Sequence, residues 1–279
     1  MAQQASWETR LAAYKSAIRS LHITEDKFSY LYFDNFQDTQ SRSDAILFLD
    51  CITEFANTLQ QAGFSHLQAS NCLVYAVELH QYRDAGTPLI KIIHKVNAVK
   101  DAVTKLASKS IDRPQLSEVT QNLFKLSQEL IEPITELLIT LSQKGIKSST
   151  LASVCETFYR HTRTTDQVNA ITELVPKFHE AGIENRFLTG LTKLFLFRVR
   201  TKNFSSACAT LAQSLSEQEV SSESICSIIR NITEYTWDSI ENKVTANLHA
   251  ISRNADKLAN IGLEEKDFAQ VIKSLAIHS

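Results

Sequence analysis

A helical hairpin that recurs along the chain constrains the fold more than any other feature, and it is clearest in residues 178–191. Numbered from Ile183 as the anchor, Phe178 lies at position −5, Gly182 at −1 and Leu191 at +8. Positions −5 and +8 are apolar in all seven copies of this frame. A fixed frame across a chain is typical of a repeat architecture. The other six anchors are Ile23, Phe64, Ile111, Ile146, Val220 and Leu263.

Each copy of the frame predicts two amphipathic helices joined by a tight turn. The apolar positions before and after each anchor are three or four residues apart, and residues with that spacing share one face of a helix. Position −1 is glycine in four copies, because the residue after a helix often adopts a left-handed conformation that glycine accepts most readily. Ser65 and Gln68 have the spacing of a capping box at the start of a second helix. The four glycines are Gly63, Gly145, Gly182 and Gly262.

Length and composition predict an all-α chain organised as a single helical-repeat domain, residues 1–279. Six glycines and four prolines in 279 residues are few, as a helical chain requires. We expect about seven antiparallel helix pairs, stacked as an α-solenoid or an elongated helical bundle. The pairs are expected near residues 7–38, 44–82, 88–126, 127–162, 166–201, 203–236 and 240–278.

The charge balance and the cysteines favour a protein of a reducing, aqueous compartment. With 29 basic and 31 acidic residues, the chain lacks the basic excess typical of nucleic-acid binding. No apolar run approaches the roughly 18 residues needed to span a bilayer, and the first residues contain no hydrophobic signal segment. Five cysteines without CxxC spacing are expected to be buried, reduced thiols. We therefore expect a cytoplasmic protein that is not exported through a cleaved signal.

Charged residues cluster at helical spacing in two places. Glu129, Glu132 and Glu136 have no histidine at ligand spacing, so we interpret them as stabilising the N-terminal part of a helix. Five lysines along the helix after Pro88 are interpreted as a solvated face, with contact to an acidic partner as the alternative. These lysines are Lys91, Lys95, Lys100, Lys105 and Lys109.

The sequence contains none of the short motifs that mark common catalytic or cofactor sites. It has no glycine-rich phosphate loop, no HExxH, no GxSxG and no Cys/His spacing of a zinc site. No catalytic residue, cofactor or metal site is predicted. A helical repeat without a catalytic cluster is expected to act as a binding surface.

The frame also predicts which residues contact a partner. In the second helix of each pair, positions +7 and +11 lie beside the core positions and hold mostly small or amide side chains. Such side chains form hydrogen bonds without repelling a partner. The alternative is that small residues at these positions let neighbouring repeats pack closely, and periodicity does not decide between the two. The candidate contact residues are Tyr30, Asp34, Asn71, Tyr75, Asn122 and Asn231.

Residues 150–219 resemble helical-hairpin repeats of the tetratricopeptide and pentatricopeptide kind. The resemblance lies in the 37-residue spacing, the apolar pattern and the turn KFHEAGIEN. The small and aromatic signature residues of tetratricopeptide repeats are absent, and the repeat length is irregular, so the resemblance concerns architecture. It implies an α-solenoid that binds a protein or peptide, and the pentatricopeptide likeness implies RNA binding as an alternative.

The C-terminal residues resemble the acidic tails of substrates of bacterial type IV secretion systems. Glu264, Glu265 and Asp267 precede Leu275 and Ile277, which lie close to the end. This resemblance implies an effector that engages a host protein such as a small GTPase, with nucleotide exchange as one activity. The alternative is that the acidic residues stabilise the first turn of the last helix. Our leading expectation is a non-catalytic scaffold that binds a protein or peptide, with these alternatives open.

Overall fold

The computed structural model describes residues 2–21, 39–81, 88–109, 111–161, 165–197, 201–237 and 239–278. The regular secondary structure in these ranges is α-helix throughout, which confirms the predicted all-α fold class. The chain divides into two compact units, Met1–Ile139 (unit 1) and Thr140–Ser279 (unit 2). The single domain over residues 1–279 stays a prediction.

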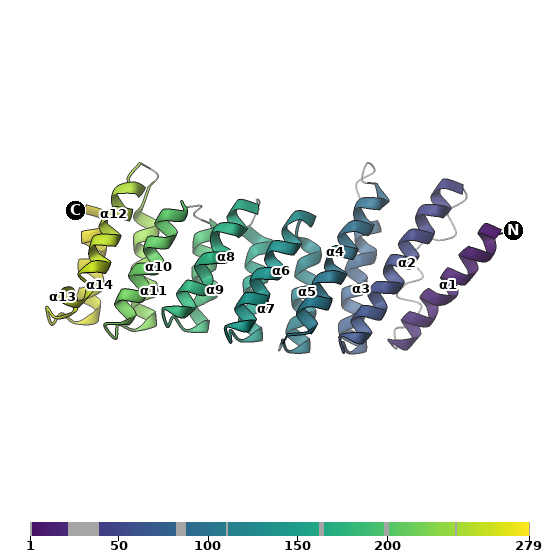
Figure 1. Ribbon diagram of the computed structural model, residues 1–279, viewed down its shortest axis with the longest axis horizontal. Helices are drawn as coiled ribbons and strands as arrows, with labels where there is room; N and C mark the ends of the chain where they lie inside the picture. Colours follow the sequence, from purple (N-terminus) through teal and green to yellow (C-terminus); the bar gives the residue numbers. More distant parts are fainter. Residues whose placement is uncertain are drawn as a thin grey trace. The chain divides into compact units, whose positions relative to one another are not determined.

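Unit 1 is built from helical hairpins whose second helix folds back against the first. Its described helices are α1 (Ala2–Ser20), α2 (Thr39–Gln61), α3 (His66–Gln81), α4 (Leu89–Ala107), α5 (Arg113–Lys125) and the first part of α6 (Gln128–Gln143). The first helices of the hairpins pack in sequence order, α1 against α2 and α2 against α4, while α3 packs against α5 (Figure 1). Like elements of neighbouring hairpins are thus side by side, as a helical repeat requires.

Unit 2 repeats this arrangement. Its described helices are α7 (Ser148–His161), α8 (Thr165–Glu180), α9 (Asn185–Phe197), α10 (Lys202–Ser216), α11 (Ser222–Tyr235), α12 (Glu241–Arg253), α13 (Ala255–Ala259) and α14 (Glu265–His278). The first helices pack in the order α8, α10 and α12, and the second helices pack in the order α7, α9, α11 and α14. The packing order within each unit agrees with the helical-hairpin architecture that the sequence indicates.

The repeated frame corresponds to one way of ending a helix. In four hairpins the anchor N–H donates a hydrogen bond to the carbonyl of the residue at −5, and the residue at −1 has a positive φ. This is the Schellman motif, in which an apolar contact accompanies the bonded pair. The frame therefore recurs because the first helices end in the same manner. The bonded pairs are Phe64 with Leu59 (3.1 Å), Ile146 with Leu141 (3.1 Å), Ile183 with Phe178 (3.0 Å) and Val220 with Leu215 (3.2 Å).

The apolar positions of the frame form the core of each unit. Position +5 is buried in every described copy, from Ala69 in α3 to Phe268 in α14. The last hairpin differs, since Leu258 and Val271 are half-buried and the anchor Leu263 is 40% exposed. At the described positions −5, +5 and +8, the frame identifies the core except in this last copy.

The cysteines belong to this core. All five are buried and none forms a disulfide, as predicted from their spacing. Burial raises the pKa of the thiols of Cys51, Cys72 and Cys226 to about 12. These thiols therefore carry no appreciable negative charge near neutral pH, and they pack as small apolar side chains.

Ion pairs join neighbouring first helices within each unit. In unit 1, Nζ of Lys100 on α4 lies 2.6 Å from a carboxylate oxygen of Glu54 on α2. In unit 2, Nζ of Lys202 on α10 lies 2.8 Å from Glu173 on α8, and this lysine lowers the pKa of the Glu173 carboxyl. The sequence predicts a solvated face for Lys100, but the neighbouring helix α2 supplies a carboxylate that periodicity within one helix does not reveal. Such exposed pairs fix helix register more than they stabilise the fold.

Of the four Schellman turns described above, one has a residue other than glycine at position −1, and it provides a prediction. Glu219 adopts the left-handed conformation with φ 61°, which costs a side chain roughly 1–2 kcal/mol. Glycine avoids this cost but loses more entropy on folding, so we expect Glu219→Gly to raise the free energy of unfolding by about 0.5–1 kcal/mol. Urea denaturation followed by circular dichroism measures the change. Glu217→Gly is the control, because Glu217 has a helical conformation and its replacement should destabilise the protein. A Glu219→Gly variant no more stable than the parent would contradict the strain at this turn.

Candidate functional site

The predicted contact residues fall in separate places. Asn71 and Tyr75 lie on α3 and Asn122 on α5, two helices that pack against each other in unit 1. Asn231 lies on α11 in unit 2. The remaining two candidates, Tyr30 and Asp34, lie outside the described residues.

On α3 and α5, a lysine brings Tyr75 and Asn122 together. Nζ of Lys125 lies 5.3 Å from the centroid of the Tyr75 ring and donates a hydrogen bond of 3.2 Å to Oδ1 of Asn122. Asn122 is 4% exposed, so its amide positions the lysine and offers little surface to a partner. Asn71, one helical turn before Tyr75, is exposed. The feature at this place is a lysine over a half-buried tyrosine, a contact worth about 0.5–1 kcal/mol at an exposed site.

In unit 2 a hollow of about 620 Å³ lies between α11 and α14. Asn231 lines it together with Ser227 and Gln270, which also hold positions predicted to face a partner. The carboxylates of Glu223 and Glu264 line it as well, and within the described residues neither makes an ion pair or a hydrogen bond. The hollow therefore offers hydroxyl, amide and carboxylate groups in one place.

Local sequence explains why this space is open. Oγ of Ser221 accepts a hydrogen bond of 3.3 Å from the N–H of Ser224, which caps α11. Ser224 and Ser227 then follow on the side that faces α14, where Ala269 approaches from the other helix. Small side chains on both helices leave a gap that larger ones would fill.

Two exposed aromatic side chains lie beyond the C-terminal end of the hollow. Tyr235, the last residue of α11 and one turn after Asn231, is 51% exposed, and Trp237 is 63% exposed. Nζ of Lys273 on α14 lies 4.0 Å from the centroid of the Tyr235 ring, a cation–π contact that links this ring to α14. The hollow together with Tyr235, Trp237 and Lys273 is called the α11–α14 surface.

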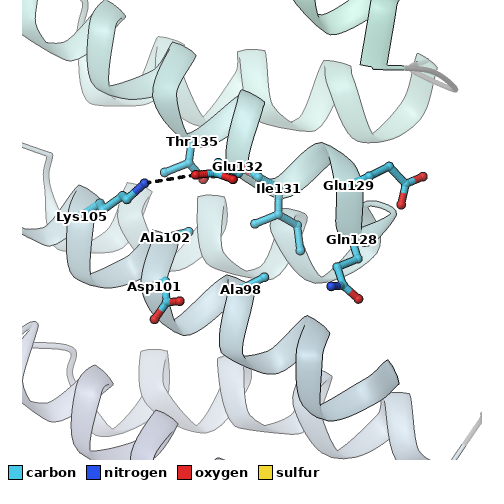
Figure 2. A pocket seen from close by; sticks show the side chains of 9 residues that line it. All are labelled: Ala98, Asp101, Ala102, Lys105, Gln128, Glu129, Ile131, Glu132 and Thr135. Carbon is cyan, nitrogen blue, oxygen red and sulfur yellow. Dashed lines mark hydrogen bonds and ion pairs between the residues drawn. The ribbon is translucent and has the colours of Figure 1, made fainter. Parts of the chain in front are cut away.

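A second hollow, of about 500 Å³, lies between α4 and α6 in unit 1 (Figure 2). Its apolar lining consists of Ala98, Ala102 and Ile131, and small residues on α4 again create the space. Nζ of Lys105 reaches across to α6, where it lies 2.7 Å from Glu136 and 3.8 Å from Glu132. Lys105 thus neutralises part of the charge at this hollow, whose described lining holds three carboxylates and one ammonium group.

The glutamate at the start of α6 has the role that its sequence position indicates. The backbone N–H of Glu129 and the hydroxyl of Ser127 both bond its carboxylate, and these hydrogen bonds lower the pKa of the Glu129 carboxyl. This supports the interpretation that Glu129 stabilises the N-terminal part of the helix. Of the charged residues that line the second hollow, Asp101 alone makes no hydrogen bond or ion pair among the described residues.

The two hollows differ in what they offer to a ligand. The carboxylates of the α11–α14 surface are not neutralised by a described basic residue, and exposed aromatic side chains follow at the other end of α11. Amides and hydroxyls can bond a peptide backbone, carboxylates attract a cation, and exposed rings take up apolar side chains. Among the described residues, no group of three His, Cys, Asp or Glu side chains could hold a metal ion. No described helix is long and apolar enough to cross a membrane.

Several residues of these surfaces were not predicted from the sequence. Lys125 lies three residues after Asn122, Tyr235 four after Asn231 and Lys273 three after Gln270, so helical spacing from the frame positions could have suggested them. Glu223 lies four residues before Ser227, so the same spacing suggests it too, but not its proximity to Glu264. Only the packing of α11 against α14 places it in the same hollow as Glu264.

Comparison with known proteins assigns no family. No protein-family model matches the chain, and neither a curated protein nor a solved structure matches it. A fold shared by many functions does not identify one, so function must be inferred from the surface itself. The chain is an all-α protein of stacked helical hairpins, and two carboxylates without an ion pair among the described residues line the hollow between α11 and α14.

Proposed function

We propose that the protein is a non-catalytic scaffold that binds a peptide segment of another protein along the α11–α14 surface. The observation that carries this proposal is a hollow in which the side chains of Ser227, Asn231 and Gln270 bond no described residue, with two exposed aromatic side chains at and just after the end of α11. Tyrosine and tryptophan are enriched in protein interfaces and supply much of their binding energy. An exposed tryptophan two residues after the end of α11 therefore supports a role in recognition.

The lining of the hollow suits an extended chain. Asn231 and Gln270 each carry an amide that both donates and accepts hydrogen bonds, and Ser227 adds a hydroxyl between them. These groups can bond the N–H and C=O groups of a peptide that lies between α11 and α14. The volume of about 620 Å³ accommodates a few side chains and not a folded domain.

The alternatives receive less support from this surface. RNA binding requires contacts to phosphates, and Glu223 and Glu264 repel them. An effector that acts on a GTPase is compatible with the same surface, since nucleotide exchange needs a shaped surface and no catalytic motif. Nothing among the described residues favours that activity over general peptide binding.

Selection from a random peptide library on the immobilised protein tests the proposal. We expect enriched peptides to lose at least tenfold in affinity for a Ser227→Arg variant, because the long side chain fills the hollow. Ser227 is exposed, so the fold should be unaffected, and circular dichroism checks this. Ser239→Arg, which makes the same change at an exposed position outside the hollow, is the control. Peptides that bind parent and Ser227→Arg equally would overturn the proposal.

A further inference from the structure

We infer that the bound segment carries a lysine or arginine whose side chain enters the hollow between Glu223 and Glu264. An apolar side chain of the same segment, about five residues away, packs on Tyr235 and Trp237. This inference rests on the proposed function and specifies the chemistry of the partner. Three observations carry it, namely the charge of the hollow, the position of the aromatic residues and the distance between them.

The charge of the hollow determines which side chain it accepts. Its described lining residues supply two carboxylates and no basic group, and the remaining groups are hydroxyls, amides and one alanine. Glu223 and Glu264 lie at the N-terminal ends of α11 and α14, where a negative charge also favours the helix dipole. Their carboxylates are nevertheless unpaired among the described residues, and a guanidinium or ammonium group brought between them is attracted by both.

Of the lysines of α14, Lys266 has a side chain outside the described part of the structure, and Lys273 lies at the opposite end of the surface. Lys273 places its ammonium over the Tyr235 ring and does not line the hollow. On α11, Arg230 is exposed and is not part of the lining either. The α11–α14 surface is thus acidic at one end and aromatic with one positive charge at the other. A segment with a cation at one end and an apolar side chain at the other complements it.

Helix geometry sets the spacing within the segment. Glu223 and Tyr235 are twelve residues apart on α11, and at a rise of about 1.5 Å per residue they are separated by about 18 Å along the helix axis. An extended peptide covers about 3.3–3.6 Å per residue, so about five residues span the same length. The basic and apolar residues of the segment are therefore expected about four to six positions apart.

The experiment extends the peptide selection to two double variants. Peptides enriched on the parent should contain lysine or arginine more often than the input library, with an apolar or aromatic residue about four to six positions away. Synthetic copies should bind Glu223→Gln/Glu264→Gln about tenfold more weakly than the parent and should weaken with added salt. Glu234→Gln/Asp256→Asn removes the same two charges at exposed positions outside the hollow and should change affinity less than twofold.

The outcomes separate this inference from the proposed function. Enriched peptides that lack lysine and arginine, yet are blocked by Ser227→Arg, would overturn the inference and leave the proposed function standing. Equal losses in the two double variants would also overturn it, because general charge would then explain the binding. Peptides that are insensitive to Ser227→Arg would overturn both.

Discussion

Replacing Leu191 by aspartate is expected to lower the free energy of unfolding of unit 2 by about 3–5 kcal/mol. Leu191 is 4% exposed in α9, which packs against α7, α8 and α11. The substitution removes a buried apolar side chain from the core of unit 2. It replaces that side chain with a carboxylate that has no basic partner there among the described residues. Urea denaturation followed by circular dichroism at 222 nm should show an early transition that is absent from the parent protein.

The adjacent residue provides a matched control for this prediction. Gly190 is exposed, and a Cβ atom added to it would meet no other atom within 4 Å. Gly190→Asp introduces the same charge one residue away and should change stability by less than about 0.5 kcal/mol. If Leu191→Asp unfolds like the parent, position +8 of the frame is not a core position and the assignment of the repeat is wrong.

Replacing Phe55 by alanine is expected to lower the free energy of unfolding of unit 1 by about 3–5 kcal/mol. Phe55 on α2 is fully buried, and its ring centroid lies 5.4 Å from that of Phe124 on α5 with the planes at 83°. The variant loses the transfer free energy of the side chain, leaves a cavity and breaks an edge-to-face pair worth about 0.5–1.5 kcal/mol. The midpoint of urea denaturation measures the combined effect.

A second variant and a control separate these contributions. In a double-mutant cycle, Phe55→Leu and Phe124→Leu should show a coupling of about 0.5–1.5 kcal/mol, because each alone breaks the same pair. Leu47→Ala on the same helix removes a side chain that is 52% exposed and should cost less than about 1 kcal/mol. Equal losses for Phe55→Ala and Leu47→Ala would contradict the buried pair.

The core was predictable from the sequence because it follows from local rules. A helix that ends in a Schellman motif needs a left-handed residue and an apolar pair around it, so Gly182, Phe178 and Ile183 are recognisable without knowledge of the fold. The rule fails at the last hairpin, where the anchor Leu263 is exposed because no later hairpin of the described chain covers it. Burial there depends on neighbours and not on local spacing.

The candidate site was only partly predictable. The frame predicts that Asn231 and Gln270 face a partner, and the structure brings them to one hollow. It also suggested Asn122, whose amide is buried against Lys125 because α3 packs over it. The packing of α3 against α5 joins residues that lie far apart in the chain, and hydrophobic periodicity within one helix carries no information about it.

Affinity capture with the purified protein tests the central claim most directly. Parent, Ser227→Arg and Ser239→Arg proteins would each be incubated with cell lysates at low and moderate salt, and bound proteins identified by quantitative mass spectrometry. The account predicts a protein partner that is retained by the parent and by Ser239→Arg at moderate salt and is lost from Ser227→Arg. Partners retained equally by all three proteins, or RNA that dissociates as the salt is raised, would contradict it.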